Sequence, residues 1–183
     1  MFFEYILILK ENSILIFFKF LLFLLLFMAS TYAGVLFSKK YVNRVEELKE
    51  IKSFLNILKN KIKFTYEPLG EIFKEISDNF SINICNLLKE ASNNMKLNSA
   101  GKSWNLALEK TKMNIKNEDK QVLTSLSKML GKTDIEGQVS QINQTAEFLD
   151  IQIENAKEEK EKNEKLYKTL GMVVGAGLVI ILI

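Results

Sequence analysis

The sequence of 183 residues contains no histidine, and it has only one cysteine (Cys85), one proline (Pro68) and one tryptophan (Trp104). The absence of histidine excludes a serine-histidine-aspartate triad and any metal site built on imidazole. A single cysteine excludes an internal disulfide and a multi-cysteine metal site. Carboxylates are numerous, but they sit beside lysines on helical faces, where nothing isolates an acid-base pair in an apolar setting. The sequence therefore predicts no catalytic, cofactor-binding or metal-binding residue, and no enzyme.

A strong excess of either charge is also absent, because 25 basic and 22 acidic residues leave a formal net charge of +3. So small a charge argues against nucleic acid as a partner. The charged residues are nevertheless concentrated in residues 38–165. Only five lie outside that range: Glu4, Lys10, Glu11, Lys19 and Lys168. The chain therefore has a polar middle segment between two apolar ends.

The N-terminal apolar segment is long enough to cross a membrane. Residues 20–37 carry no charge and would span about 27 Å as a helix, close to the thickness of a hydrocarbon core. With Lys19 reaching the headgroups, the predicted transmembrane helix covers residues 14–37. A cleaved signal peptide, with a small-residue site at Thr31 to Ala33, is the alternative. Residues 1–13 are interrupted by charges and form an N-terminal extension, which either lies at the membrane interface or precedes the true start.

The C-terminal apolar segment is shorter. Residues 170–183 carry no charge and would span about 21 Å, which rises to about 27 Å when the predicted segment starts at residue 166. Gly171 and Gly175 form a G-x-x-x-G pattern that lets another transmembrane helix approach closely. The alternatives are a segment that only dips into the membrane and a buried helix of a soluble domain.

Basic residues flank both apolar segments on the side of the middle segment. After the first segment come Lys39, Lys40, Arg44, Lys49 and Lys52, and before the second come Lys157, Lys160, Lys162, Lys165 and Lys168. Because cytoplasmic flanks carry the excess of lysine and arginine, both segments place residues 38–165 in the cytoplasm. The charged flanks would then lie near the headgroups of membrane lipids. Both termini would then lie on the outer side.

The middle segment shows helical periodicity and no alternating strand pattern. Apolar residues recur every three or four positions over residues 45–62 and 139–156, which predicts two long antiparallel helices. Shorter patterns predict helices over residues 69–77, 82–94, 103–112 and 117–130. We therefore expect an all-α fold, an antiparallel bundle of about six helices. Trp104 and Leu108 are predicted in the core, and Cys85 is predicted as a buried reduced thiol.

Two corners of the bundle carry the most informative local patterns. Gly131 can adopt the left-handed conformation that closes a helix, and Thr133 with Glu136 predicts a capping box at the start of the last helix. Asp134 and Gln138 are exposed in this reading and could form a contact surface. Pro68, Leu69 and Glu71 predict a helix N-terminus, where proline is tolerated.

Four stretches of the chain, taken in order, resemble stage III sporulation protein AB of endospore-forming bacteria. They are residues 44–48 (RVEEL), 62–71 (IKFTYEPLGE), 130–138 (LGKTDIEGQ) and 164–171 (EKLYKTLG). The chain departs from the family pattern at Gly70, where a second proline is usual, and at Glu67, where threonine is usual. The two corners supply six candidate interaction or corner residues: Pro68, Leu69, Glu71, Gly131, Asp134 and Gln138.

The resemblance implies a component of the transenvelope channel that joins mother cell and forespore, placed in the mother-cell membrane facing the forespore. In that family the cytosolic domain is similar to the platform protein of type II secretion and type IV pilus machines. The implied partners are a secretion-type ATPase and other stage III sporulation channel subunits, and a homo-oligomer is compatible with this role. A membrane-bound signalling or regulatory bundle is the alternative function.

Overall fold

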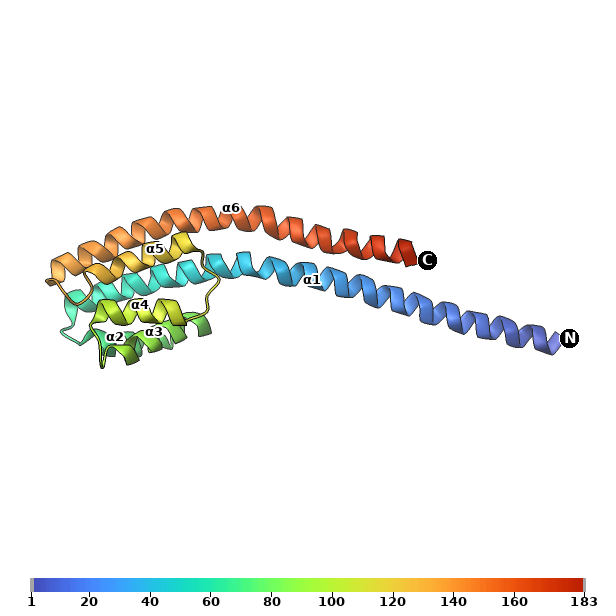
Figure 1. The fold of residues 1–183 in the computed structure, drawn as a ribbon, viewed down its shortest axis with the longest axis horizontal. Coiled ribbons are helices and arrows are strands. Elements are labelled where there is room, and N and C mark those ends of the chain that lie inside the picture. The colour runs from blue at the N-terminus through green and yellow to red at the C-terminus, as the bar shows by residue number, and fades with distance from the viewer. Residues whose placement is uncertain (1, 183) are drawn as a thin grey trace. The chain divides into compact units, whose positions relative to one another are not determined.

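The computed structural model describes the backbone of residues 2–182 and the side chains of residues 16–182. Over that range every regular element is a helix, and there is no strand. Its elements are α1 (Phe2–Phe64), α2 (Leu69–Ser77), α3 (Ile82–Asn94), α4 (Ala100–Lys110), α5 (Asn117–Ser125), the 3-10 helix η1 (Leu126–Lys128) and α6 (Ile135–Leu182) (Figure 1). The predicted all-α class with six helices is confirmed. The predicted N-terminal extension, residues 1–13, lies outside the residues whose side chains are described.

The chain divides into two compact units. One, which we call the head, is Tyr41–Lys160, and the other, the apolar helix pair, joins Met1–Lys40 to Glu161–Ile183. Helices α1 and α6 each contribute to both units, because neither is interrupted between its apolar part and its amphipathic part.

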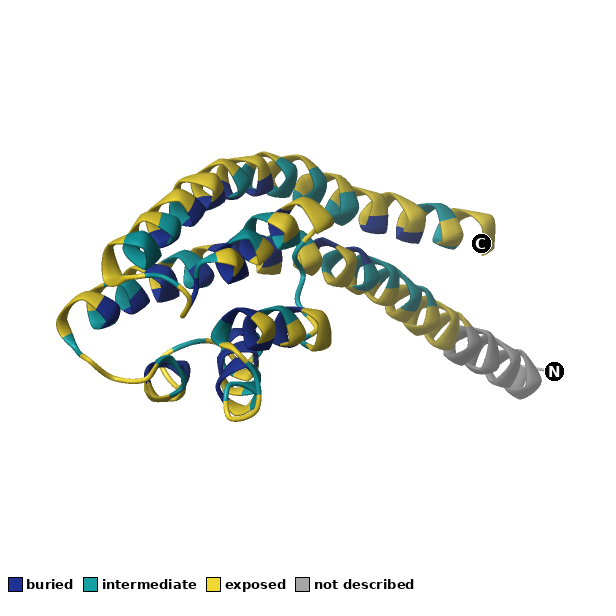
Figure 2. Cartoon of the chain, turned by 60° about the vertical axis from the view of Figure 1, so that its left-hand side comes forward, coloured by how far each residue is buried: buried dark blue, intermediate teal, exposed yellow. Residues whose placement is uncertain are grey.

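The head core follows the apolar periodicity of the sequence. On α1 the predicted stripe is buried throughout and consists of Val45, Leu48, Ile51, Leu55, Leu58 and Ile62. On α6 the buried apolar positions of the head are Ile142, Leu149, Ile153 and Ala156, whereas Val139 and Ala146 of the same stripe are half-buried. Buried residues therefore recur on the inward face of each long helix, while the opposite face is exposed (Figure 2). Burial of these faces is the main favourable term for the bundle.

An aromatic cluster lies at the centre of the head. The ring of Trp104 stacks on Phe54 with centroids 5.9 Å apart and meets the edge of Phe73 at 6.0 Å. The Trp104 indole N–H donates a hydrogen bond of 2.7 Å to the carbonyl oxygen of Leu123, so the only polar atom of the ring is satisfied. The predicted burial of Trp104 and Leu108 is confirmed. The predicted burial of Cys85 is wrong, because its side chain is only half-buried and Sγ lies 3.7 Å from the Asp78 carboxylate.

Two helix boundaries differ from the predicted ones for local reasons. Helix α4 begins at Ala100, directly after Ser99, a residue type favoured at the cap position. Helix α5 ends at Ser125 and continues as the 3-10 turn η1, whereas one helix over residues 117–130 was expected. The hydroxyls of Ser125 and Ser127 donate to the carbonyls of Val122 and Thr124, which competes with regular α-helical bonding there.

Within the apolar helix pair, α1 and α6 come into backbone contact at small residues. A methyl group added to Gly34 would lie 2.5 Å from the carbonyl oxygen of Tyr167, and one added to Gly171 would lie 2.9 Å from that of Ser30. The Ser30 hydroxyl donates a hydrogen bond of 2.8 Å to the carbonyl of Gly171. The close approach predicted from the two glycines of α6 is thus made by the first helix of the same chain.

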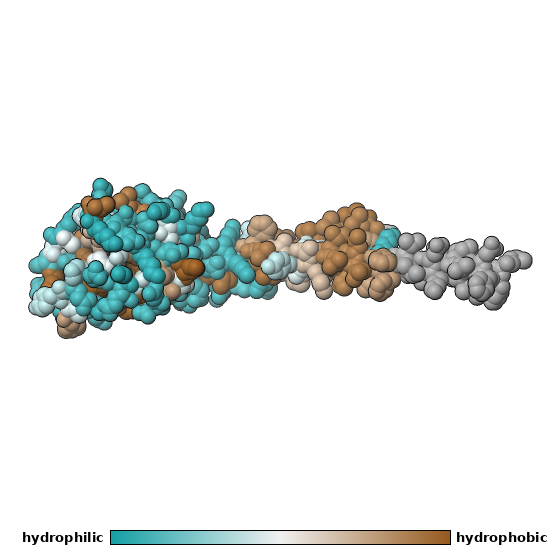
Figure 3. Space-filling view, turned by 90° about the horizontal axis from the view of Figure 1, so that it is seen from below, coloured by the Kyte–Doolittle hydropathy of each residue, from teal (hydrophilic) through white to brown (hydrophobic). Residues whose placement is uncertain are grey.

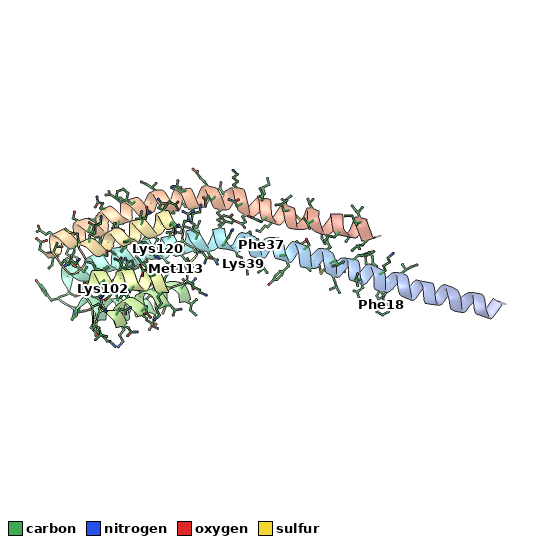
Figure 4. All side chains as sticks on the ribbon, in the orientation of Figure 1. Phe18, Phe37, Lys39, Lys102, Met113 and Lys120 are labelled. Carbon is green, nitrogen blue, oxygen red and sulfur yellow. The ribbon has the colours of Figure 1, made fainter. Side chains whose placement is uncertain are left out.

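Both long helices contain an 18-residue stretch that is apolar enough to cross a membrane, and almost none of either stretch is buried within the chain. The low burial argues against a soluble core helix for the C-terminal segment. Figure 3 shows hydrophobic atoms gathered over these stretches and hydrophilic atoms over the head. The change is sharp on α1, where exposed Phe37 is followed closely by exposed Lys39 (Figure 4). Composition and exposure together indicate association with a membrane.

Candidate functional site: the two ends of the head

Three connecting segments of the head meet at one end, which we call the loop end. They are residues 65–68 between α1 and α2, 95–99 between α3 and α4, and 129–134 before α6. They come together at Gly131, where an added methyl group would lie 3.0 Å from Cβ of Ala100, the first residue of α4, and 3.4 Å from Cδ1 of Leu69, the first residue of α2. The structure therefore brings together the two corners that the sequence singled out.

The first corner surrounds the start of α2. Pro68 occupies the cap position with φ −59° and ψ 137°, and its carbonyl accepts hydrogen bonds from the N–H groups of Glu71 (2.9 Å) and Ile72 (3.1 Å). Proline suits this position because a helix has no internal partner for the first N–H groups. Leu69 is half-buried against the core, whereas Pro68 and Glu71 are exposed.

The second corner is held by Gly131 and Gln138. Gly131 has φ +71°, the left-handed conformation predicted for it. Its N–H donates to Oε1 of Gln138 at 3.0 Å, while Nε2 of Gln138 donates to the carbonyl of Thr133 at 3.0 Å. One amide side chain on α6 thus holds two residues of the preceding loop, Gly131 and Thr133, and Gln138 is half-buried instead of exposed.

The predicted capping box of Thr133 and Glu136 is not formed. The Thr133 hydroxyl points back to the carbonyl of Met129 at 3.4 Å, and Asp134 is the residue before the helix. The Asp134 carboxylate accepts a hydrogen bond of 2.9 Å from the N–H of Gly137, the third residue of α6. Asp134 is therefore the cap, one residue later than expected, and its negative charge lies at the positive end of the helix dipole.

Large apolar side chains are exposed around the loop end. Tyr66 is 98% exposed, Leu97 91% and Phe64 72%. They come from the end of α1 and from two of the connecting segments, so they belong to different parts of the sequence. Single exposed apolar residues are common, but several at one end of a small domain are typical of a contact surface.

A groove of about 520 Å³ lies beside this end, between α2 and α3. The hydroxyl of Ser92 on α3 donates a hydrogen bond of 2.8 Å to the carbonyl of Gly70 on α2, which fixes the two helices to each other. Residues of both helices line the groove: Pro68, Gly70, Glu71, Lys74, Lys89, Ser92, Asn93, Met95 and Lys96.

The opposite end of the head contains a buried polar network that the sequence reasoning missed. Arg44 on α1 binds Asp119 on α5 through two hydrogen bonds, Nε to Oδ2 at 2.8 Å and Nη2 to Oδ1 at 2.9 Å. Its Nη1 donates to Glu159 on α6 at 2.7 Å, and Glu159 also pairs with Lys116. Arg44 and Asp119 are both buried. Bidentate bonding to Asp119, with a further contribution from Glu159, raises the pKa of Arg44 above its ordinary value.

Glu47, one helical turn further along α1, extends the network. Its carboxylate accepts hydrogen bonds from Nδ2 of Asn83 (2.7 Å), the N–H of Asn114 (2.6 Å) and Nδ2 of Asn114 (2.8 Å). Arg44 and Glu47 together therefore connect α1 to α3, α5, α6 and the loop before α5. A signal was available in the sequence, because Arg44 is the only arginine among 25 basic residues. The planar guanidinium of arginine can bind both oxygens of a buried carboxylate, whereas the ammonium group of lysine lacks this geometry.

Among the residues that the structure describes, no group of three or more histidine, cysteine, aspartate or glutamate side chains is placed to hold a metal ion. The loop end presents exposed apolar side chains on capped loops, and the opposite end fixes the helices through buried charges.

Comparison with known proteins gives three consistent matches. A family model described as stage III sporulation protein AB matches residues 19–183. Stage III sporulation protein AB of Bacillus subtilis (strain 168) is 25% identical over 158 residues, which cover 84% of this chain and 92% of the relative. A solved structure of a stage III sporulation protein AB superposes with a TM-score of 0.60 at 20% identity, covering 64% of this chain and 96% of that one, which shows a shared fold.

Proposed function

Since the chain belongs to the stage III sporulation protein AB family, we propose that it is a non-catalytic platform component of the channel between mother cell and forespore. In this role the head docks a secretion-type ATPase, and the apolar helices contact other channel subunits. Family membership supports the place in sporulation, and the two apolar stretches support a membrane anchor. The docking of an ATPase is inferred from the resemblance together with the loop end.

The proposed topology is a membrane hairpin. Residues 14–37 and 166–183 form the two spans, and residues 38–165 lie in the mother-cell cytoplasm. Lysines and Arg44 flank the spans on the side of the head, which supports this orientation. The neighbouring membrane is that of the forespore.

The observation that carries the docking proposal is the exposure of Phe64, Tyr66 and Leu97 at the loop end. Aromatic and large apolar side chains contribute most of the binding energy at protein interfaces, because they remove much surface from water when a partner covers them. Of the candidate residues, Pro68, Leu69 and Glu71 end the segment of Tyr66 or directly follow it. Gly131 packs against Ala100, the residue that directly follows the segment of Leu97. Asp134 and Gln138 hold the segment 129–134 beside them.

A binding assay tests this surface. The purified full-length chain in detergent micelles is titrated against the secretion-type ATPase that the resemblance implies. The chain is used as wild type and as the double variant Tyr66→Ser with Leu97→Ser. We expect the variant to bind at least about tenfold more weakly, because two exposed apolar contacts are lost. Both side chains are almost fully exposed, so the fold should be unchanged.

Ile82→Ser is the matched control, because Ile82 is 76% exposed and lies at the far end of α3 from residues 95–99. It should bind the ATPase as the wild type does. Absence of binding by the wild-type chain would overturn the ATPase proposal. Equal losses of ATPase affinity in the control and in the double variant would show that the docking surface does not lie at the loop end.

A signalling bundle is the second candidate, favoured by the uninterrupted course of α1 and α6 from their apolar parts into the head. Such helices could transmit a rotation or a piston motion. This candidate predicts a ligand-sensitive change in helix packing. A deletion strain that arrests at engulfment without losing a sensory response would exclude it.

A further inference from the structure

The groove between α2 and α3 is positively charged. Its lining contains three ammonium groups, on Lys74, Lys89 and Lys96, and one carboxylate, on Glu71. Lys89 forms an ion pair of 2.6 Å with Asp78, which lies outside the lining, so Lys74 and Lys96 provide most of the excess charge. Met95 adds an apolar surface to the lining. The groove therefore suits an acidic segment that also carries apolar side chains.

The outward face of α6 in the head has this chemistry. At about 100° per residue, Glu147, Ile151, Glu154 and Glu158 point away from the buried stripe, and Phe148 lies beside them. Phe148 is 46% exposed and Ile151 56%. Glu154 pairs at 2.6 Å with Lys157 on the flank of the same helix, and no base lies on the outward face itself between Ser140 and Glu158. We call these five residues the α6 strip.

We propose that the α6 strip of one copy docks in the α2–α3 groove of a second copy. The two surfaces are opposite in charge and each combines charged with apolar groups. They lie on opposite faces of the head, with α1, α4 and α5 between them (Figures 1 and 2). When the strip of one copy binds the groove of the next, the first copy still has a free groove and the second still has a free strip. Repetition of the contact therefore produces a ring or an open chain of heads.

The occupant is a second copy because both surfaces belong to the same chain and are therefore always present in equal number. Exposed ion pairs contribute little individually, so the contact is weak in dilute solution and weakens further with salt. Anchoring of both copies in one membrane raises their effective concentration and allows a weak contact to form. The groove shares Pro68 and Glu71 with the candidate interaction residues, whereas Tyr66 and Leu97, on which the test of ATPase docking rests, do not line it.

Cysteine cross-linking in membranes tests the contact with the full-length chain. Cys85→Ser provides a cysteine-free background, and two differently tagged chains carry Asn93→Cys in the groove and Ile151→Cys on the strip. On oxidation we expect a mixed dimer, and a chain that carries both cysteines should give a ladder of higher species. The pair Lys102→Cys and Ile151→Cys is the control. A mixed dimer no stronger than this control, or a predominance of dimers linked through the same site, would overturn the proposal.

Charge exchange provides a second test. Lys74→Glu with Lys96→Glu, or Glu147→Lys with Glu154→Lys, should each reduce the mixed dimer at least about tenfold, because like charges then face each other. A chain with all four changes should recover cross-linking, and Lys102→Glu with Lys128→Glu should leave it unchanged. Failure of the four changes to restore the dimer would overturn the proposal. The loop-end variant Tyr66→Ser with Leu97→Ser should cross-link normally, which separates this test from that of ATPase docking.

Discussion

The two ends of the head are built on different principles. At the loop end, neutral or exposed groups hold short loops: one glycine in the left-handed conformation, one glutamine amide and one aspartate cap. At the other end, a buried guanidinium and two buried carboxylates join five parts of the head. The first arrangement leaves apolar side chains in solvent, whereas the second removes charges from it.

This difference separates contact from support. Each bond at the loop end contributes a modest amount, so residues there can change without loss of the fold. A buried charge that loses its partner is strongly unfavourable, so the network admits few alternatives. The loss in free energy of unfolding caused by a substitution should therefore be several-fold larger at the network than at the loop end.

The largest effect is expected at the network. Asp119→Ala leaves the Arg44 guanidinium buried without its bidentate partner and should lower the free energy of unfolding by about 3–5 kcal/mol. Urea unfolding of the full-length chain in detergent micelles, followed by circular dichroism, measures this change. The double variant Arg44→Met with Asp119→Leu should recover most of the loss, because it removes both charges. A loss below about 1 kcal/mol in Asp119→Ala would show that the network is not a support.

An intermediate effect is expected at Gly131. Gly131→Ala forces a side chain into the left-handed conformation and against Ala100, which should lower the free energy of unfolding by about 1–2 kcal/mol. Gly70→Ala is the matched control, because its new methyl group would make only an ordinary contact of 3.6 Å with Met95. The same unfolding measurement should show Gly70→Ala to be neutral or slightly stabilising. Equal losses at both glycines would contradict the conformational explanation.

The smallest effect is expected at the cap of α6. Asp134→Ala removes the acceptor for the N–H of Gly137 and should lower the free energy of unfolding by about 1 kcal/mol, whereas Asp134→Asn should retain most of it. Hydrogen exchange of the first turn of α6 provides a local measure of the same change. If Asp134→Ala leaves both quantities unchanged and instead weakens ATPase binding, Asp134 is a contact residue.

The helices of the head were predictable because their apolar stripes repeat every three or four residues. The start of α6 was misplaced by one residue because Thr133 and Asp134 are both good caps, and the choice between them depends on the loop that Gly131 and Gln138 shape. A capping pattern alone does not resolve such a choice, since the two alternatives differ by one residue and depend on how the loop closes.

The buried network was not predictable from spacing. Arg44 and Asp119 are 75 positions apart, and Glu159 lies 115 positions from Arg44. Each residue taken alone resembles any charged position on a helical surface, and only the bundle brings them together. The rarity of arginine was the one usable sign, because a chain that otherwise uses lysine has a specific need where it uses arginine.

The buried position of Trp104 also makes the head its own optical reporter. The chain has a single indole, and it lies stacked on Phe54 in the core of the head. Its fluorescence therefore reports the state of the head alone, even when the whole chain is in detergent or lipid. Emission should shift to longer wavelength when water reaches the ring, and bound subunits that lack tryptophan would leave this signal unobscured.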